Sequence, residues 1–156
     1  MYSRTENIAL ALLLLLVISL TGCDGGLEPK PPPLYGAIEG TIIYEGDWPS
    51  QESVKDLRFV ALREVPAGIE DFLNFETMVI GPRLEYEVEQ DHFLIEDVKS
   101  ATYRYSGVAR QFSDQLIDWE PLGLYKENGG VFTVEGDTVR LDIRVDFENL
   151  PPFPPE

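Results

Sequence analysis

The sequence predicts an all-β protein whose folded part is a single antiparallel β-sandwich of about seven short strands, with one short helical insertion. In most of the chain, apolar residues alternate with polar ones, which is the period of a half-buried strand. Glycine, proline, asparagine and aspartate gather between the alternating segments, where turns require them. Apolar residues have helical spacing only once, over a short stretch.

The clearest strand is residues 138–147, where apolar and charged residues alternate throughout. We therefore expect it to have one buried face and one face in water, within an antiparallel sheet. Residues 57–65 are apolar on both sides in their middle, which is typical of a central strand. The other expected strands are residues 38–44, 83–89, 92–95, 102–112 and 131–134.

The helical insertion is expected within residues 68–75. Ile69, Phe72 and Leu73 stand at positions i, i+3 and i+4, so they share one face of a helix. The segment has room for roughly two turns. We expect it to cover an open edge or end of the sandwich.

Residues 1–22 have the features of an export signal. A short polar start with Arg4 precedes residues 8–20, which are 13 uncharged and mostly apolar residues. Because a membrane-spanning helix needs roughly 17–25 apolar residues, this run is too short to be one. The sequence therefore predicts a signal peptide that is removed on export.

Cys23 is the only cysteine, and it directly follows Leu20, Thr21 and Gly22. One apolar residue, two small residues and a cysteine resemble the lipobox of bacterial lipoproteins. The resemblance implies cleavage before Cys23, a lipid on its thiol and acyl chains such as palmitate. It also implies a protein of the bacterial cell envelope, lipid-anchored to the outer membrane or to the periplasmic face of the inner membrane.

The chain is therefore expected to have four segments. Residues 1–22 are the signal peptide, 23–34 are the lipidated cysteine and a proline-rich linker, 35–150 are the sandwich, and 151–156 are a proline-rich tail. The linker composition cannot bury a core, and the prolines of the tail prevent strand pairing. We expect the tail either to fray or to pack as a strip on the domain, and a docking peptide is the third interpretation.

The balance of charge limits the partners. The chain has 12 basic and 28 acidic residues, a net charge of −16. So acidic a surface repels nucleic acid and anionic lipid head groups. We expect no nucleic-acid partner. The expected partners are the membrane, through the acyl chains on Cys23, and an unidentified envelope protein or glycan.

The domain also resembles a known family. Glycines and apolar residues alternate in the expected first strand, and an apolar strand followed by a tyrosine comes later, although residues 100–102 replace the usual glycine of the turn between them. These features are similar to the carboxypeptidase-regulatory-like, or transthyretin-like, modules of envelope proteins. The resemblance implies a seven-stranded prealbumin-like, Ig-like sandwich and implies no catalysis. The matching residues are Gly36, Ile38, Gly40, Ile42, Phe93, Leu94, Ile95, Val98 and Tyr103.

Nothing in the sequence predicts an enzyme. His92 is the only histidine, and the nucleophile pattern G-x-S-x-G is missing from the sequence. One histidine and a lipidated cysteine do not make a zinc site. We therefore expect no catalytic residue, no metal site and no cofactor. Weak calcium binding by the acidic segment 114–120 is the alternative, because calcium prefers oxygen ligands.

Aromatic residues are the remaining candidates for a ligand or partner surface. In one interpretation they form an exposed platform for a sugar ring or a partner protein. In the other, the two tryptophans plug the open ends of the sandwich. The candidate residues are Trp48, Tyr103, Tyr105, Trp119 and Tyr125.

The expected function is that of a lipid-anchored cell-envelope protein, a non-enzymatic structural or protein-interaction module. The alternative is a carbohydrate- or peptide-binding lipoprotein that serves an envelope transport system. An exposed, contiguous patch of tryptophan and tyrosine would favour the alternative.

Overall fold

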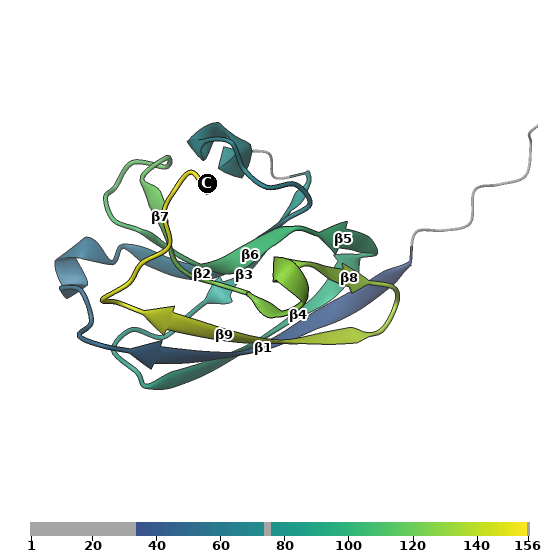
Figure 1. The fold of residues 1–156 in the computed structure, drawn as a ribbon, viewed down its shortest axis with the longest axis horizontal. Coiled ribbons are helices and arrows are strands. Elements are labelled where there is room, and N and C mark those ends of the chain that lie inside the picture. The colour runs from purple at the N-terminus through teal and green to yellow at the C-terminus, as the bar shows by residue number, and fades with distance from the viewer. Residues whose placement is uncertain (1–33, 74–75, 156) are drawn as a thin grey trace, which may run out of the picture. The chain divides into compact units, whose positions relative to one another are not determined.

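The structure is a computed structural model, and it describes residues 34–73 and 76–155 (Figure 1). The predicted signal peptide, Cys23 and the linker up to residue 33 lie outside the described residues. Within them, nine strands and three short 3-10 helices follow one another along the chain. The strands are β1 (Tyr35–Glu45), β2 (Asp56–Leu62), β3 (Met78–Arg83), β4 (Gln90–Lys99), β5 (Ala101–Tyr103), β6 (Tyr105–Gln111), β7 (Trp119–Leu124), β8 (Phe132–Val134) and β9 (Thr138–Asp146). The 3-10 helices are η1 (Gln51–Ser53), η2 (Ile69–Leu73) and η3 (Glu127–Gly130).

The protein is all-β and sandwich-like, with two larger sheets and a small third one. The first sheet has the order β4-β1-β9, the second has the order β3-β2-β6-β7, and β5 pairs with β8. The described part thus has nine strands where about seven were expected. The pairs are antiparallel except β1 with β9, which run parallel. The expectation of an antiparallel neighbour for residues 138–147 is wrong, because a long crossover and not a hairpin connects the two strands.

A hydrophobic core fills the space between the two larger sheets. Ile38 and Ile42 enter it from β1, and Phe59 enters it from β2. The alternation predicted for residues 138–147 is confirmed, because Leu141, Ile143 and Val145 are buried while the charged residues between them are exposed. Residues 57–65 are confirmed as a central strand over their first part, since β2 lies between β3 and β6.

One close contact in this core depends on a glycine. Gly40 on β1 lies opposite Phe93 on β4, whose ring stacks on Phe59 with 4.5 Å between ring centroids. A Cβ atom on residue 40 would overlap the ring of Phe93. The glycine of the predicted first strand therefore makes room for an aromatic side chain of the neighbouring strand.

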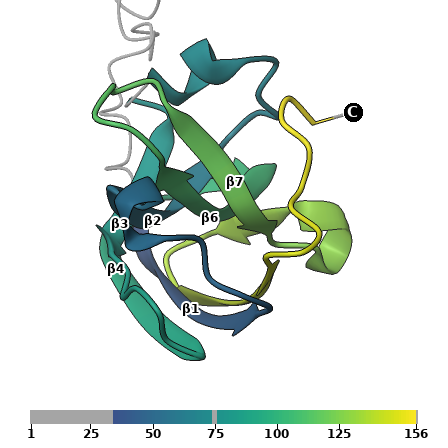
Figure 2. The same cartoon turned by 90° about the vertical axis from the view of Figure 1, so that its left-hand side faces the viewer.

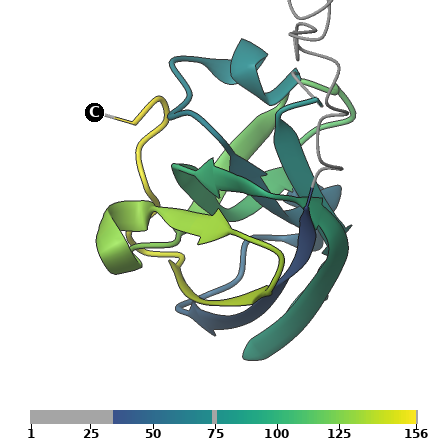
Figure 3. The ribbon, with the colours of Figure 1, turned by 90° about the vertical axis from the view of Figure 1, so that its right-hand side faces the viewer.

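The second sheet is apolar on its outer face as well. A separate cluster there includes Val60, Leu62 and Tyr105, and Phe72 of η2 covers it. Figures 1, 2 and 3 place η2 over this sheet, on the side away from β1 and β9. The predicted helical insertion is thus confirmed as a short 3-10 helix, but it covers a sheet face and not an edge or end.

The proline-rich tail packs on the same outer face. Phe153 joins the outer cluster, and its ring lies 5.4 Å from the ring of Phe72 in an edge-on arrangement. Of the alternatives for the tail, the described residues 151–155 therefore form a packed strip.

One predicted strand is a loop. Arg83 ends β3, and residues 84–89 form the loop that connects β3 to β4. Glu87 in this loop has a φ of 60°, outside the extended region of the backbone. Leu84 is buried, and Tyr86 and Val88 are half-buried against the core. The alternation correctly identified the side chains that face inward, but it did not reveal that the backbone there is a loop and not a strand.

Two strands were not expected. β3 contains Pro82 and β7 contains Pro121, and both strands lie at an edge of the second sheet. Proline is compatible with an edge strand, because such a strand leaves N–H positions that no neighbour uses. No helix in residues 34–73 and 76–155 is long and apolar enough to cross a membrane.

Candidate functional site

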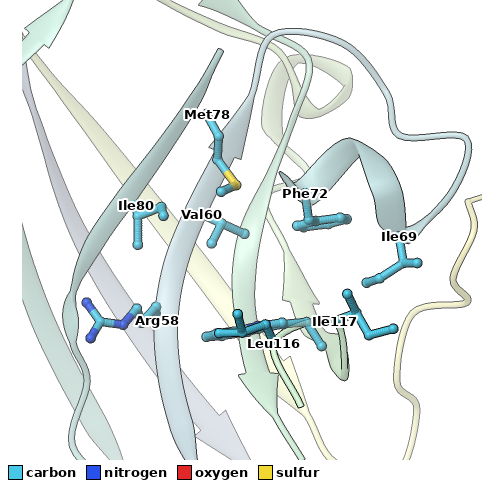
Figure 4. A pocket seen from close by; sticks show the side chains of 9 residues that line it. Arg58, Val60, Ile69, Phe72, Met78, Ile80, Leu116 and Ile117 are labelled. Atoms are coloured by element: carbon cyan, nitrogen blue, oxygen red, sulfur yellow. The ribbon is translucent and has the colours of Figure 1, made fainter. Parts of the chain in front are cut away.

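The outer face of the second sheet carries an apolar groove, shown close up in Figure 4. β2 positions its floor by simple alternation: Phe59 and Ala61 enter the main core, so Arg58 and Val60 face the groove. A sheet face in contact with water normally carries polar side chains. The floor consists of Arg58, Val60, Met78, Ile80 and Trp119.

η2 and the loop between β6 and β7 form the walls of the groove. η2 contributes Ile69 and Phe72, and the loop contributes Leu116 and Ile117. The groove has a volume of about 290 Å³, at the lower end of the ~300–1,000 Å³ that is typical of small-molecule sites. Arg58 is the one polar residue among the nine that line it. The groove therefore suits a small apolar group with a charged or polar end.

Asp71 holds η2 in place. Its Oδ2 atom accepts hydrogen bonds from the backbone N–H of Ala67 at 2.7 Å and of Gly68 at 3.4 Å. These bonds satisfy donors at the start of a helical segment. Phe72 then packs edge-on against Tyr105, with 6.3 Å between ring centroids. The wall is thus fixed both by polar bonds at its start and by an aromatic contact with the sheet.

The loop between β6 and β7 is also well connected. The Gln111 side-chain amide donates to the backbone oxygen of Gln115 at 2.7 Å, and the N–H of Gln115 donates to the Ser113 hydroxyl at 3.0 Å. The Ser113 hydroxyl in turn donates to the carboxylate of Asp118. These bonds define the conformation of a loop that has no strand partner for its central residues.

This ordered loop presents large aliphatic side chains to water. Leu116 is 82% exposed and Ile117 is 46% exposed. Across the groove, Ile80 is also exposed. Contiguous exposed apolar side chains around a concave surface are typical of a binding site. The groove is therefore the best candidate site in the described part of the chain.

The rim of the groove at Arg58 carries an excess of positive charge. Arg58 on β2 and Arg83 on β3 are direct cross-strand partners. Asp56 is the carboxylate between them: Arg58 Nε lies 2.6 Å from Oδ2, and Arg83 Nε lies 3.6 Å from Oδ1. One carboxylate thus faces two guanidinium groups, which leaves a net charge of about +1 at this rim.

Trp48 lies away from the groove, at an end of the main core. Its ring is 4.5 Å from the ring of Tyr44 and 4.7 Å from the ring of Phe147. Its indole N–H donates to the backbone oxygen of Val88 at 3.2 Å. Trp48 therefore has the contacts that the plug interpretation predicts.

The three predicted tyrosines do not form an exposed platform. Tyr103 and Tyr125 are buried and pack against Phe132, with ring centroids 5.1 and 6.0 Å away. Tyr105 is buried under Phe72 in the outer cluster. Burial raises the pKa of Tyr105 to about 12 and raises the pKa of Tyr103 and Tyr125 as well. The expectation of a shared surface for these residues is corrected, because each is packed inside the domain.

Trp119 is the predicted site residue that does reach the candidate site. It begins β7, is half-buried, and lines the groove beside the loop that carries Leu116. Its indole face is available to an apolar ligand.

His92 lies on the exposed side of β4. Its ring nitrogens lie 3.3 Å from the Thr41 hydroxyl and 2.8 Å from the Gln90 side-chain amide. In residues 34–73 and 76–155, no group of three or more His, Cys, Asp or Glu side chains gathers in a way that could hold a metal ion. In the acidic segment 114–120, the Asp118 carboxylate is engaged by the Ser113 hydroxyl.

Sequence reasoning missed most of the groove. Leu116 and Ile117 follow each other in a segment with no strand alternation, and they are flanked by Gln115 and Asp118. An apolar pair in an otherwise polar loop was the available signal. The pairing of Arg58 with Arg83 had no local signal, because it depends on the register between β2 and β3.

Comparison with known proteins found no family model, no curated protein and no solved structure that matches this chain.

Proposed function

We propose that the protein is a non-enzymatic, lipid-anchored binding module of the bacterial cell envelope. Its β domain, tethered through Cys23, binds a partner or ligand in the groove between Trp119, Phe72 and Leu116. The observation that carries this proposal is the apolar groove with exposed aliphatic walls on an otherwise strongly acidic chain.

The location rests on the sequence. The apolar run of residues 8–20 and the lipobox-like residues before Cys23 support export and lipidation. Two or three acyl chains anchor a protein firmly, whereas a single chain gives marginal binding.

For the fold we propose a variant of the prealbumin-like sandwich. The sheets β4-β1-β9 and β3-β2-β6-β7 together account for seven strands, and β5 and β8 are an addition. Gly36 and Gly40, which carried the resemblance, both lie at close contacts of β1, and this supports the assignment.

A peptide-binding accessory of an envelope transport system is the second candidate. The groove supports it, because an apolar side chain of a peptide fits a site of this size. The carbohydrate form of this alternative has lost its support, since the tyrosines expected to stack on sugars are buried.

Two experiments test the proposal. Alkyne-palmitate labelling in a bacterial host should mark the wild type and not Cys23→Ser. A photocrosslinking amino acid at residue 116 should then give a discrete adduct in intact envelopes, whereas the same group at residue 94 should not. Leu94 is a matched control, because it is also exposed but lies on β4 of the other sheet. Equal adducts at both positions would contradict a binding role for the groove.

A further inference from the structure

We propose that the groove binds a single-chain amphiphile with an anionic head group, of the fatty-acid class. The inference deepens the proposed function, on which it rests, by naming the class of ligand. The alkyl chain lies along the apolar groove, and the carboxylate lies at the rim formed by Arg58 and Arg83.

The size and lining of the groove favour a single alkyl chain as the apolar part of the ligand. Eight of its nine lining residues are apolar. A volume of about 290 Å³ takes roughly ten groups of the size of a methylene or a water, at ~30 Å³ each. One alkyl chain of about that length fits, whereas two chains or a fused ring system exceed the space.

The charge at the rim selects the head group. The protein as a whole has a net charge of −16, so an anion is repelled from most of its surface. At the rim, however, Arg58 and Arg83 share the single carboxylate of Asp56. Like charges directly opposite each other on neighbouring strands are unfavourable. A second carboxylate, supplied by the ligand, would complete the pairing.

Arg58 retains hydrogen-bonding capacity for that carboxylate. Its Nε donates to Asp56 and its Nη1 donates to the backbone oxygen of Gly81 at 3.1 Å. In the described part of the chain these are its hydrogen bonds, so Nη2 is available. Figure 4 shows Arg58 at the margin of the lining residues beside Ile80, with its guanidinium directed away from Phe72 and Ile69. The alkyl part of Arg58 thus borders the groove while its charge lies at the rim.

The test uses the full-length, lipid-anchored chain in neutral phosphatidylcholine vesicles. The probe is dodecanoate with a diazirine near the end of its chain, and the labelled residues are mapped after irradiation. We expect saturable labelling within residues 112–118 and η2. Unlabelled dodecanoate should compete about tenfold better than dodecanol, because the guanidinium rim favours the anion.

Substitutions at the rim separate the contribution of the head group to binding from that of the alkyl chain. Arg58→Gln should abolish the preference for dodecanoate over dodecanol. Arg83→Gln should reduce it without disturbing the Arg58–Asp56 pair, because the Arg83 side chain is 66% exposed. Arg140→Gln is the control, since this exposed arginine lies on β9 and pairs with Glu39. It should leave the preference unchanged.

The outcomes distinguish the two proposals. If dodecanoate and dodecanol compete equally for labelling inside the groove, the groove is an apolar binding site and the inference about the head group is wrong. If the probe labels the groove no more than the rest of the domain, both the inference and the binding role of the groove are contradicted.

Discussion

Arg58 on β2 and Arg83 on β3 face each other across an antiparallel strand pair, and Asp56 is the carboxylate that both guanidinium groups approach. Asp56 also accepts a hydrogen bond from the backbone N–H of Leu57 at 2.9 Å. This arrangement links the stability of the sheet edge to the charge at the rim of the groove. It also gives the rim an excess of positive charge, although the protein as a whole is strongly acidic.

Removing the shared carboxylate should destabilise the domain. We expect Asp56→Asn to lower the free energy of unfolding by ~1–3 kcal/mol, because two opposed guanidinium groups lose a charged acceptor. Arg83→Gln should change it by less than ~0.5 kcal/mol, since this side chain is largely exposed and its charge is in excess. Urea unfolding of the three proteins measures both effects. Equal losses for the two variants would contradict the shared role of Asp56.

A methyl group at residue 40 should disrupt the core. In Gly40→Ala the new Cβ meets the ring of Phe93, so we expect a loss of ~2 kcal/mol or more. The exposed neighbour Glu39 is the control, and Glu39→Ala should cost less than ~1 kcal/mol as a surface ion-pair residue. Adding Phe93→Leu to Gly40→Ala should recover part of the loss. Thermal unfolding of the wild type and the three variants tests this, and an unchanged midpoint for Gly40→Ala would be inconsistent with the packing described.

Trp48 should behave as a structural plug. Its ring contacts Tyr44, Tyr86 and Phe147, so Trp48→Ala should destabilise the domain by ~3 kcal/mol. Trp48→Phe should lose less, because it keeps an aromatic ring but not the bond to the Val88 oxygen. Probe binding to the groove, measured below the unfolding temperature, should be unaffected by Trp48→Phe. A stable Trp48→Ala protein would indicate a surface role instead.

Buried tyrosines should make the domain sensitive to alkali. Burial raises the pKa of Tyr105 to about 12, above the value of ~10 in an unfolded chain. The folded state therefore holds the phenol proton more tightly. This contribution to stability is fully present below pH ~10 and is lost as the pH rises from there towards 12.

Tyr105→Phe isolates this effect. In the described residues the Tyr105 hydroxyl is buried without a hydrogen-bond partner, so its removal should be neutral or slightly stabilising at pH 7. Between pH 10 and 11.5 the variant should lose less stability than the wild type. Guanidinium unfolding at a series of pH values measures the two slopes, and parallel slopes would contradict the prediction.

The sequence predicted the all-β class because alternation and turn residues are local signals. The buried face of residues 138–147 and the position of β2 inside its sheet followed from those signals. The parallel pairing of β1 with β9 did not, since strand direction depends on the path of the whole chain. β3 and β7 were missed because Pro82 and Pro121 usually indicate turns, and only their edge positions make them compatible with strands.

The candidate site was less predictable than the fold. Trp119 was identified as an aromatic residue with a choice of two roles, and it lines the groove. Tyr103, Tyr105 and Tyr125 were expected beside it, but the sequence does not distinguish a buried tyrosine from an exposed one. The groove itself forms only where η2 and the loop between β6 and β7 meet the sheet, and such a meeting of distant segments has no signature in either segment.

Quenching of Trp119 fluorescence tests the central claim most directly. In the Trp48→Phe background, Trp119 is the remaining tryptophan of the chain, so its emission reports on the groove. We predict that 12-bromododecanoate quenches it saturably and that unbrominated dodecanoate reverses the quenching. In a Trp119→Phe background the emission of Trp48, in the main core, should be little affected. Equal, non-saturating quenching of both tryptophans would contradict the claim that the groove binds an anionic single-chain amphiphile.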